Sequence, residues 1–338
     1  MPVTLKDIAR MANVSHMTVS RVVNGSQNVS EETRERVQKI IQETNYAPSE
    51  TARALISGKT NTIGILVMYD LSRFPQDFLP TLLEGISFSL YERGYGCTLL
   101  FDQVNGKKNV ISKRMLQKGQ IDGLLIVSVE RDAAVRKRVQ DTDVPVVLVN
   151  QRIQEENVGY VVADEVRGSC EAVTYLLENG HRNIGYLGGT PVFSTSEERL
   201  EGYKKALKSH GVPFRPTLCR VGDFDNQKSY QQVLELLQQH PEVTAIFAAN
   251  DAMALGAYRA AAELGLSIPQ DLSVVGYDNQ EYCQYIQPPL TTVSKHRRAM
   301  GKKAASLIVE AIESKKSPGK VVLNPELKVR SSVRKVGE

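Results

Sequence analysis

The chain has 338 residues, of which 41% are hydrophobic and 24% are charged, a composition typical of globular proteins. That length predicts two or three domains rather than one core. The 42 Lys and Arg residues exceed the 38 Asp and Glu residues by only four, so net charge gives weak support for an anionic partner. The composition excludes fibrous and disordered classes, and the longest apolar runs, such as 63–68 and 144–149, are too short for a membrane span.

The N-terminal sequence and the cysteine spacing both bear on the compartment. Lys6, Asp7 and Arg10 interrupt the apolar run that a secretory signal peptide needs. Four cysteines are widely spaced, without a C-x-x-C pair: Cys97, Cys170, Cys219 and Cys283. This spacing predicts buried free thiols rather than a zinc site or a disulfide framework. We therefore expect a cytoplasmic protein without a metal or a cofactor.

The first 48 residues have helical periodicity throughout, which predicts an all-helical unit. Thr4 is expected to begin a first helix as its N-cap, with Asp7 as a capping-box partner, and a break follows at 12–14. Ser15 is expected to begin a second helix that ends at Asn24. The predicted core positions of these two helices are Leu5, Ile8, Ala9, Ala12, Val19, Val22 and Val23.

A third helix is predicted to begin at Ser30 and to end before Pro48. Glu31 and Glu32 lie in its first turn, where the helix dipole favours acidic groups. Its predicted core face consists of Val37, Ile40, Ile41 and Thr44. Two short helices joined by a tight turn and supported by a third are typical of a helix-turn-helix DNA-binding unit.

The second predicted helix has a polar face that suits the major groove of DNA. This face comprises Ser15, His16, Met17, Thr18, Ser20, Arg21 and Asn24. Its hydroxyl and amide groups can bond phosphate oxygens, Arg21 can make two hydrogen bonds to guanine, and His16 and Met17 lie where base edges are met. The alternative is a helical bundle with a solvated polar face. Eight basic and six acidic side chains in residues 1–60 leave a net charge of only +2, which does not decide the question.

A short linker follows the predicted helical unit, and the pattern of apolar residues changes after the linker. Residues 49–59 are predicted to form a short helix that is ordered only when something packs against it. From Thr60 onward, apolar strands alternate with amphipathic helices. The predicted strands are 63–68, 97–101, 124–129, 146–149, 184–187, 246–249 and 274–277. Strands without a polar face indicate parallel sheets covered on both sides, and their number indicates two doubly wound lobes.

Polar residues follow many of these strands, at the edge where doubly wound sheets bind their ligands. They are Tyr69, Asp70, Ser128, Asn150, Asn250, Asp251 and Asp278. Such side chains form hydrogen bonds to ligands rich in hydroxyl or amide groups. The alternative for each position is a turn residue or a helix cap, because Asn and Asp favour both.

Several strings in the first 60 residues together resemble the DNA-binding headpiece of the lac repressor (LacI/GalR) family. They are Thr-Leu-Lys-Asp-Ile-Ala-Arg at 4–10, Ala-Asn-Val-Ser at 12–15, Thr-Val-Ser-Arg-Val-Val-Asn-Gly at 18–25, Asn-Tyr-Ala-Pro at 45–48 and Ala-Arg-Ala-Leu at 52–55. The resemblance implies that Thr4, Leu5 and the second-helix face bind double-stranded DNA. It also implies that 49–59 fold into a hinge helix on the operator, where Leu55 wedges into the minor groove. The alternative for Leu55 is ordinary packing.

The resemblance extends along nearly the whole chain. The strings Ala-Ala-Asn-Asp-Ala-Met-Ala-Leu-Gly at 248–256 and Ser-Val-Val-Gly-Tyr-Asp at 273–278 are similar to family segments. Arg199, Asn250 and Asp278 match positions of the family's effector pocket. The resemblance therefore implies a small-molecule site at the carboxyl ends of the predicted strands.

Two departures from the family bear on the expected ligand. Asn150 stands where the family often has Asp, which implies a different hydroxyl pattern in the ligand. Lys295-His296 replaces the family's common Gln-Pro, and this favours an acidic effector over a hinge surface role. Phe224 is either an aromatic platform for a sugar face or a base, or a core residue. The expected effector-binding residues are Tyr69, Asn150, Arg199, Phe224, Asn250 and Asp278.

The expected fold class is α/β, with two doubly wound parallel-sheet lobes like those of periplasmic binding proteins after a small all-α helix-turn-helix headpiece. Residues 60–338 are expected to bind the effector and to dimerise. The expected headpiece, hinge, first lobe and second lobe are 1–48, 49–59, 60–162 plus 292–323, and 163–291 plus 324–338.

The resemblance implies a homodimer that pairs partly through a helix at about 78–93 and binds a pseudo-palindromic operator. It predicts a transcription repressor whose operator affinity is controlled by a sugar, a sugar acid or a sugar phosphate. The sequence carries no dinucleotide fingerprint, P-loop or nucleophile elbow, so an enzyme is not expected. The alternatives are a regulator that responds to a purine or another metabolite, an enzyme, and a transport-type sugar-binding protein, which would lack residues 1–60. No membrane partner is expected.

Overall fold

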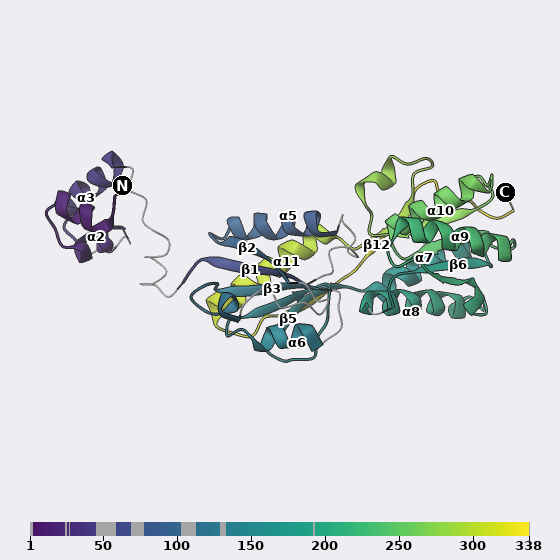
Figure 1. Cartoon of the computed structure of the whole chain (residues 1–338), viewed down its shortest axis with the longest axis horizontal. Coiled ribbons are helices and arrows are strands. Elements are labelled where there is room, and N and C mark those ends of the chain that lie inside the picture. The colour runs from purple at the N-terminus through teal and green to yellow at the C-terminus, as the bar shows by residue number, and fades with distance from the viewer. Residues whose placement is uncertain are drawn as a thin grey trace. The chain divides into compact units, whose positions relative to one another are not determined.

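The computed structural model describes residues 3–23, 26, 28–44, 59–68, 78–102, 113–128, 133–191 and 193–337. Contacts divide the chain into two units, residues 1–60 and 61–338. Asn24, Leu55 and Tyr69 lie outside the described residues, as does nearly all of the expected hinge helix, so the roles proposed for them stay predictions. Figure 1 shows the helices and strands of both units.

The described residues of the first unit form three helices: α1 (Leu5–Met11), α2 (His16–Val23) and α3 (Glu31–Glu43). The predicted capping box of α1 is confirmed, because the Thr4 hydroxyl accepts a hydrogen bond from the Asp7 N–H and the Asp7 carboxylate accepts one from the Thr4 N–H at 3.0 Å. Apolar side chains of all three helices form one small core: Ile8, Ala9, Ala12, Val19, Val22 and Val37. The predicted core residues Leu5, Val23, Ile40 and Ile41 are only partly buried against it.

The first sheet of the second unit has six strands in the order β11-β5-β4-β3-β1-β2, and all neighbours are parallel. The strands are β1 (Thr62–Met68), β2 (Gly96–Asp102), β3 (Gly123–Ser128), β4 (Val146–Val149), β5 (Val158–Ala163) and β11 (Lys320–Leu323). Its helices are α5 (Phe78–Tyr91), α6 (Ala133–Gln140), α11 (Arg297–Ser314) and the 3-10 helix η1 (Lys113–Leu116). Helices α5 and α11 cover one face and α6 covers the other, with an apolar core on each side (Figure 1).

The second sheet also has six strands, in the order β12-β10-β9-β8-β6-β7, and only β12 is antiparallel to its neighbour. The strands are β6 (Ile184–Gly188), β7 (Cys219–Val221), β8 (Ala245–Ala248), β9 (Ser273–Tyr277), β10 (Thr291–Ser294) and β12 (Glu326–Lys328). Its helices are α7 (Glu165–Glu178), α8 (Ser194–Ser209), α9 (Asn226–Gln239), α10 (Asp251–Glu263), η2 (Pro216–Leu218) and η3 (Glu281–Gln284). Two doubly wound lobes are therefore present, as the sequence predicts.

The chain crosses between the two sheets at three places: after β5, after β10 and between β11 and β12. The sequence analysis assigns 292–294 to the first lobe, but these residues pair with β9 and β12 in the second sheet. The crossing therefore comes later, at Lys295 and His296, before α11 begins. The reason is that Thr291–Ser294 is fully buried, and such a strand is accommodated inside a sheet rather than in a linker.

Details of the backbone, the cysteines and the helices complete the description. Gly94, Gly119, Gly180 and Gly265 all have a positive φ, the left-handed conformation that glycine adopts readily where a helix ends. The prediction of buried thiols is wrong for Cys97, which is exposed on the edge strand β2, whereas Cys283 is buried; all four cysteines are free. Among the described residues, no helix is long and apolar enough to cross a membrane.

Candidate functional site

Helix α2 exposes the polar face that the sequence predicts. His16, Met17 and Arg21 are exposed, while Thr18 and Ser20 are half-buried. Val19 and Val22 point into the core from the opposite side. Because Met17 and Arg21 are four residues apart, they lie on the same side of the helix. Met17 is 56% exposed, so its side chain is available for a contact.

The Ser15 side chain is engaged in the local structure of α2. Its hydroxyl accepts a hydrogen bond from the Thr18 N–H at 3.1 Å, which confirms the predicted cap, and it also lies 2.9 Å from the Thr18 hydroxyl. Ser15 thereby satisfies one of the N–H groups that a helix leaves unpaired at its start. Thr4 likewise caps α1. These two residues position their helices, whatever else they contact.

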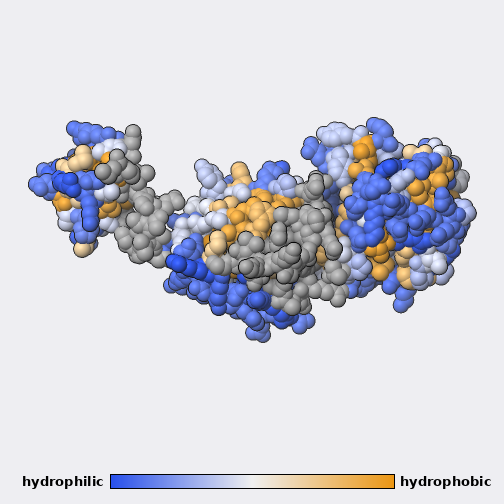
Figure 2. All heavy atoms as spheres, in the orientation of Figure 1, coloured by the Kyte–Doolittle hydropathy of each residue, from blue (hydrophilic) through white to orange (hydrophobic). Residues whose placement is uncertain are grey.

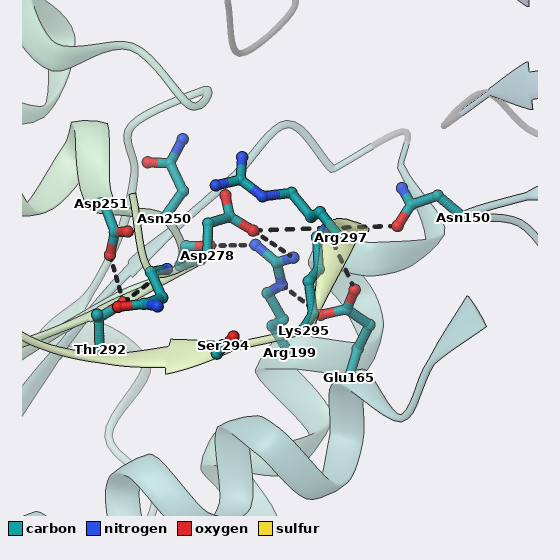
Figure 3. Close-up of polar contacts among 12 residues, drawn as sticks. Asn150, Glu165, Arg199, Asn250, Asp251, Asp278, Thr292, Ser294, Lys295 and Arg297 are labelled. Atoms are coloured by element: carbon teal, nitrogen blue, oxygen red, sulfur yellow. Dashed lines mark hydrogen bonds and ion pairs between the residues drawn. The ribbon is translucent and has the colours of Figure 1, made fainter. Parts of the chain in front are cut away.

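The second candidate site centres on Arg199 in α8, in the second unit (Figure 3). Its Nε donates a hydrogen bond to Glu165 Oε2 at 2.8 Å, and its Nη1 donates one to the carbonyl of Ala249, which follows β8. Its Nη2 lies 3.8 Å from Asp278 Oδ1, and the guanidinium stacks 3.9 Å from the centre of the Tyr277 ring. Only 2% of Arg199 is exposed, so the predicted effector residue is a buried, fully engaged cation.

Lys295 lies at the same cluster, although the sequence analysis leaves a surface position open for it. Only 3% of the residue is exposed, which excludes the hinge surface role. Its Nζ donates a hydrogen bond to Asn150 Oδ1 at 3.3 Å and lies 3.4 Å from Asp278 Oδ1 and 3.6 Å from Glu165 Oε1. Lys295 therefore joins Asn150, which follows β4 of the first sheet, to carboxylates that are held by the second lobe (Figure 3).

Local backbone structure explains how these side chains reach one another. Asp164 caps α7 by accepting a hydrogen bond from the Arg167 N–H, which places Glu165 in the first helical turn. Asn150 and Asp278 follow β4 and β9 with φ values of 67° and 108°, a region in which Asn and Asp are tolerated better than most residues. The side chains turn out of the sheets at these positions instead of continuing the strand.

Asn250 and Asp251 both have structural roles next to the Arg199 cluster. Asn250 caps α10, since its Oδ1 accepts a hydrogen bond from the Met253 N–H at 2.8 Å. Asp251 is fully buried and accepts hydrogen bonds from the Thr292 hydroxyl at 2.5 Å and the Gln280 N–H at 2.7 Å. The helix-cap alternative is therefore correct for Asn250, which still lies one residue after the Ala249 carbonyl that Arg199 contacts.

Phe224 lies beside Arg199 and also packs as a core residue. Its ring stacks on Phe193 with centroids 6.0 Å apart, and the Arg199 guanidinium lies 6.0 Å from its centre. Its backbone has a φ of 60°. Gly189 is required beneath the ring, because a Cβ there would lie 2.0 Å from the ring carbons. Phe224 is half-buried, so it combines both roles that the sequence leaves open.

The charges of the cluster shift the pKa values of its carboxyl groups in opposite directions. Burial alone would raise the pKa of Glu165, but the charges of Arg199 and Lys295 outweigh burial and lower it to about 2. Burial and the negative charge of Asp278 raise the pKa of Asp251 to about 7. Burial and the charge of Glu165 raise the pKa of Glu198 to about 7 as well.

The structure thus brings together four predicted effector residues, Asn150, Arg199, Phe224 and Asp278. It adds Glu165, which the sequence analysis does not identify. No motif surrounds Glu165, and its partners Arg199 and Lys295 are far away in the sequence. The sequence offers one indication of Glu165 as a site residue, because it is an acidic residue in the first turn of a helix that follows a strand. The same position also fits an ordinary helix dipole interaction.

The fold, the exposed polar face of α2 and the Arg199 cluster define a class of protein: a helix-turn-helix headpiece followed by a two-lobed ligand-binding unit. Comparisons with known proteins agree. The model of the lacI family of bacterial regulatory proteins matches residues 4–49, and that of the periplasmic binding protein-like domain matches residues 173–333. The transcriptional regulator CelR of Thermobifida fusca is 34% identical over 336 residues, which cover 97% of this chain and 98% of the relative.

Other relatives extend this match. The transcriptional repressor PurR of Vibrio vulnificus is 34% identical over 337 residues, covering 98% of this chain and 99% of the relative. The solved structure of the lac repressor dimer bound to operator and the anti-inducer ONPF matches with a TM-score of 0.87 and 29% identity, covering 99% of this chain and all of that one. A CelR–cellobiose complex matches with a TM-score of 0.75 and 34% identity, covering 97% and 99%. The chain belongs to the lacI family of bacterial regulatory proteins.

Proposed function

We propose that this protein is a transcription repressor that binds a pseudo-palindromic DNA operator as a homodimer and is controlled by a small polar effector. The proposal is supported by the presence of two candidate sites in the same chain. Helix α2 exposes Met17 and Arg21 to a partner, and the cluster around Arg199 lies where the strands of both sheets end. A transport-type binding protein would have only the second site.

The DNA site of the proposal is the exposed face of α2. Arg21 would contact guanine, and Met17 would contact a thymine methyl group. Thr4, Ser15, Thr18 and Ser20 would bond phosphates. Leu55, from the predicted hinge at 49–59, would wedge into the minor groove and kink the operator.

The dimer surface of the proposal is the exposed apolar face of the first lobe. Phe88 and Tyr91 of α5 are 55% and 81% exposed, and Leu99 and Phe101 of the edge strand β2 are also exposed. Figure 2 shows apolar side chains gathered over this part of the first lobe. A contiguous apolar patch of this kind is typical of an association surface. Two headpieces held by one dimer would bind the two halves of a palindrome.

The effector site of the proposal is the Arg199 cluster, with Phe224 beside it. Buried polar groups and an aromatic ring are the combination that binds sugars and nucleobases. A sugar is preferred over a nucleobase, because the chain supplies carboxylates and an amide for hydroxyl groups and because the similar protein CelR is solved as a complex with cellobiose. Effector binding would change the spacing of the two hinge segments and so couple to DNA with about 1–3 kcal/mol.

Selection of bound duplexes from a random library by the full-length protein tests the DNA part of the proposal. We expect enrichment of a two-fold symmetric site, and Leu55→Ala should weaken binding of that site without changing thermal unfolding. Enrichment of no sequence would contradict the proposed function. A thermal-shift screen of the full chain against sugars, sugar acids, sugar phosphates and purines tests the effector part, because a ligand that binds only the folded state raises the melting temperature.

A further inference from the structure

Lys295 is both buried and located where the chain crosses between the two sheets. No other lysine among the described residues combines these two features. Lys295 lies directly after β10 of the second sheet and before α11 of the first lobe, at one of the crossings between the sheets. Its ammonium group is buried and lies 4.6 Å from the centre of the Phe78 ring in α5. A lysine is seldom buried in this way unless its charge is paired.

Three oxygen atoms surround the ammonium group of Lys295. Asn150 Oδ1 accepts its hydrogen bond, and Asp278 Oδ1 and Glu165 Oε1 lie within ion-pair distance. These two carboxylate oxygens are buried and have no hydrogen-bond partner among the described residues. Lys295 therefore faces the Glu165 oxygen that Arg199 does not bond, and it pairs with the same Asp278 oxygen as Arg199, at the shorter distance of 3.4 Å against 3.8 Å. The neighbouring Arg297 is engaged with Gln280 Oε1 at 2.8 Å.

The four central charges balance. Glu165 and Asp278 contribute two negative charges, and Arg199 and Lys295 contribute two positive ones. Because unpaired charge in a buried site is costly, an effector that brings a charge of its own would disturb this balance. An anionic ligand would find both cations already paired. A cationic ligand would compete with an ammonium group that is already in place.

We propose that Lys295 is a specificity-determining residue of the effector site: it is the resident counter-cation of Glu165 and Asp278, and it sets the charge class of the effector as uncharged. This inference rests on the proposed function. It reverses the expectation from the sequence, where a cation at this position favours a sugar acid or a sugar phosphate. Removal of the ammonium group leaves a net negative site that prefers an amine-bearing ligand.

The first test measures the charge role without any ligand, by thermal unfolding of the full chain. Lys295→Met should lower the melting temperature, and adding Asp278→Asn should restore part of the loss because Asn also suits the positive φ at that position. Lys316→Met, at an exposed lysine just after α11, serves as the control and should change little. Additive losses in the double variant would overturn the counter-cation role. Lys295→Gln, which keeps a donor without the charge, replaces Lys295→Met in the cycle if that variant does not fold.

The second test measures ligand charge with matched probes: aldoses, their amino sugars and their uronic acids. In the wild type, we expect only the uncharged member of a set to raise the melting temperature. In Lys295→Met, the amino sugar should bind at least about tenfold more tightly than it binds the wild type. Binding of a uronic acid by the wild type, lost in Lys295→Met, would overturn the inference. If no probe binds either protein, the sugar class of the proposed function is contradicted, while the unfolding cycle still decides the role of Lys295.

Discussion

The headpiece and the two-lobed unit place their polar chemistry in opposite environments. In the headpiece, polar side chains are exposed and contact residues three positions away, as Ser15 contacts Thr18. In the two-lobed unit, they are buried and contact residues that are distant in sequence: Arg199 is 34 positions from Glu165, and Lys295 is 145 positions from Asn150. The polar side chains of the headpiece are therefore available to a partner. Those of the two-lobed unit are already engaged in contacts that hold the lobes and the site together.

This difference indicates in which unit a single substitution should affect both function and stability. With the proposed function, loss of an exposed side chain on α2 should remove a contact to DNA and change stability little. Loss of a buried charge in the second unit should remove a proposed ligand contact and also leave its partner uncompensated.

Arg199→Ala should lower the free energy of unfolding by about 3–5 kcal/mol and abolish the effector response, because it leaves Glu165 and Asp278 in a buried site without their main partner. Urea unfolding of the full chain measures the first effect. Arg167→Ala is the control: Arg167 pairs with Glu171 at 2.8 Å with half of its side chain exposed, and such pairs contribute about 1 kcal/mol or less. Equal stability of the two variants would contradict the buried network.

Ile8→Ala should destabilise the headpiece by about 2–5 kcal/mol, because Ile8 is fully buried in a core of few residues. DNA binding should then be lost while unfolding of residues 61–338 is unchanged. Hydrogen exchange measured separately for the two units checks this expectation. Met11→Ala, at an exposed apolar residue of α1, should leave both units unchanged. Simultaneous destabilisation of both units would show that they do not unfold independently.

Arg21→Ala and Met17→Ala should each weaken operator binding by about 1–3 kcal/mol through lost base contacts. Stability should change by no more than about 0.5 kcal/mol, since both side chains are exposed. Fluorescence anisotropy with the selected operator measures affinity. Lys39→Ala, at an exposed residue of α3, is the comparison variant. If it weakens binding as much as the α2 variants do, α2 is not the recognition surface.

Asp251→Asn should flatten the pH dependence of stability. The pKa of Asp251 in the folded protein is about 7, above its ordinary value of 3.8, so the folded state holds this proton more tightly than the unfolded state. Its contribution to stability is therefore present below about pH 4 and is lost as the pH rises towards 7. Melting temperatures across this range should fall less in the variant than in the wild type. An identical slope would show that Asp251 is ionised throughout.

The headpiece is highly predictable from sequence because its determinants are local. The capping of α1 by Thr4 and of α2 by Ser15, and the burial of Val19 and Val22, all follow from spacing within one or two helical turns. Most predicted strands of the lobes likewise correspond to buried apolar runs, whereas the predicted strand 97–101 is the largely exposed edge strand β2. The strands that the sequence analysis does not predict are β5, β7, β10 and β11. Strands β7 and β11 are short and partly exposed, and three of the four residues of β10 are polar, whereas β5 is a buried apolar run that the pattern analysis misses.

The effector cluster could be predicted only in part. Asn150, Arg199 and Asp278 are identifiable as polar groups after strands or within family strings, but their partners depend on how distant segments pack. The charge of Lys295 suggests an acidic ligand when it is considered alone. Its proximity to Glu165 and Asp278, which becomes visible only in the folded chain, indicates the opposite.

We propose that the Arg199 cluster controls the affinity of the headpiece for DNA. The most direct test of this proposal is the dissociation constant of the full-length protein for the selected operator, measured by anisotropy with and without a saturating ligand from the thermal-shift screen. The account predicts a change of about 5- to 150-fold in the wild type and none in Arg199→Lys, which cannot reproduce the contacts to Glu165, Ala249 and Asp278 together. The same dissociation constant for the wild type with and without bound ligand would contradict it.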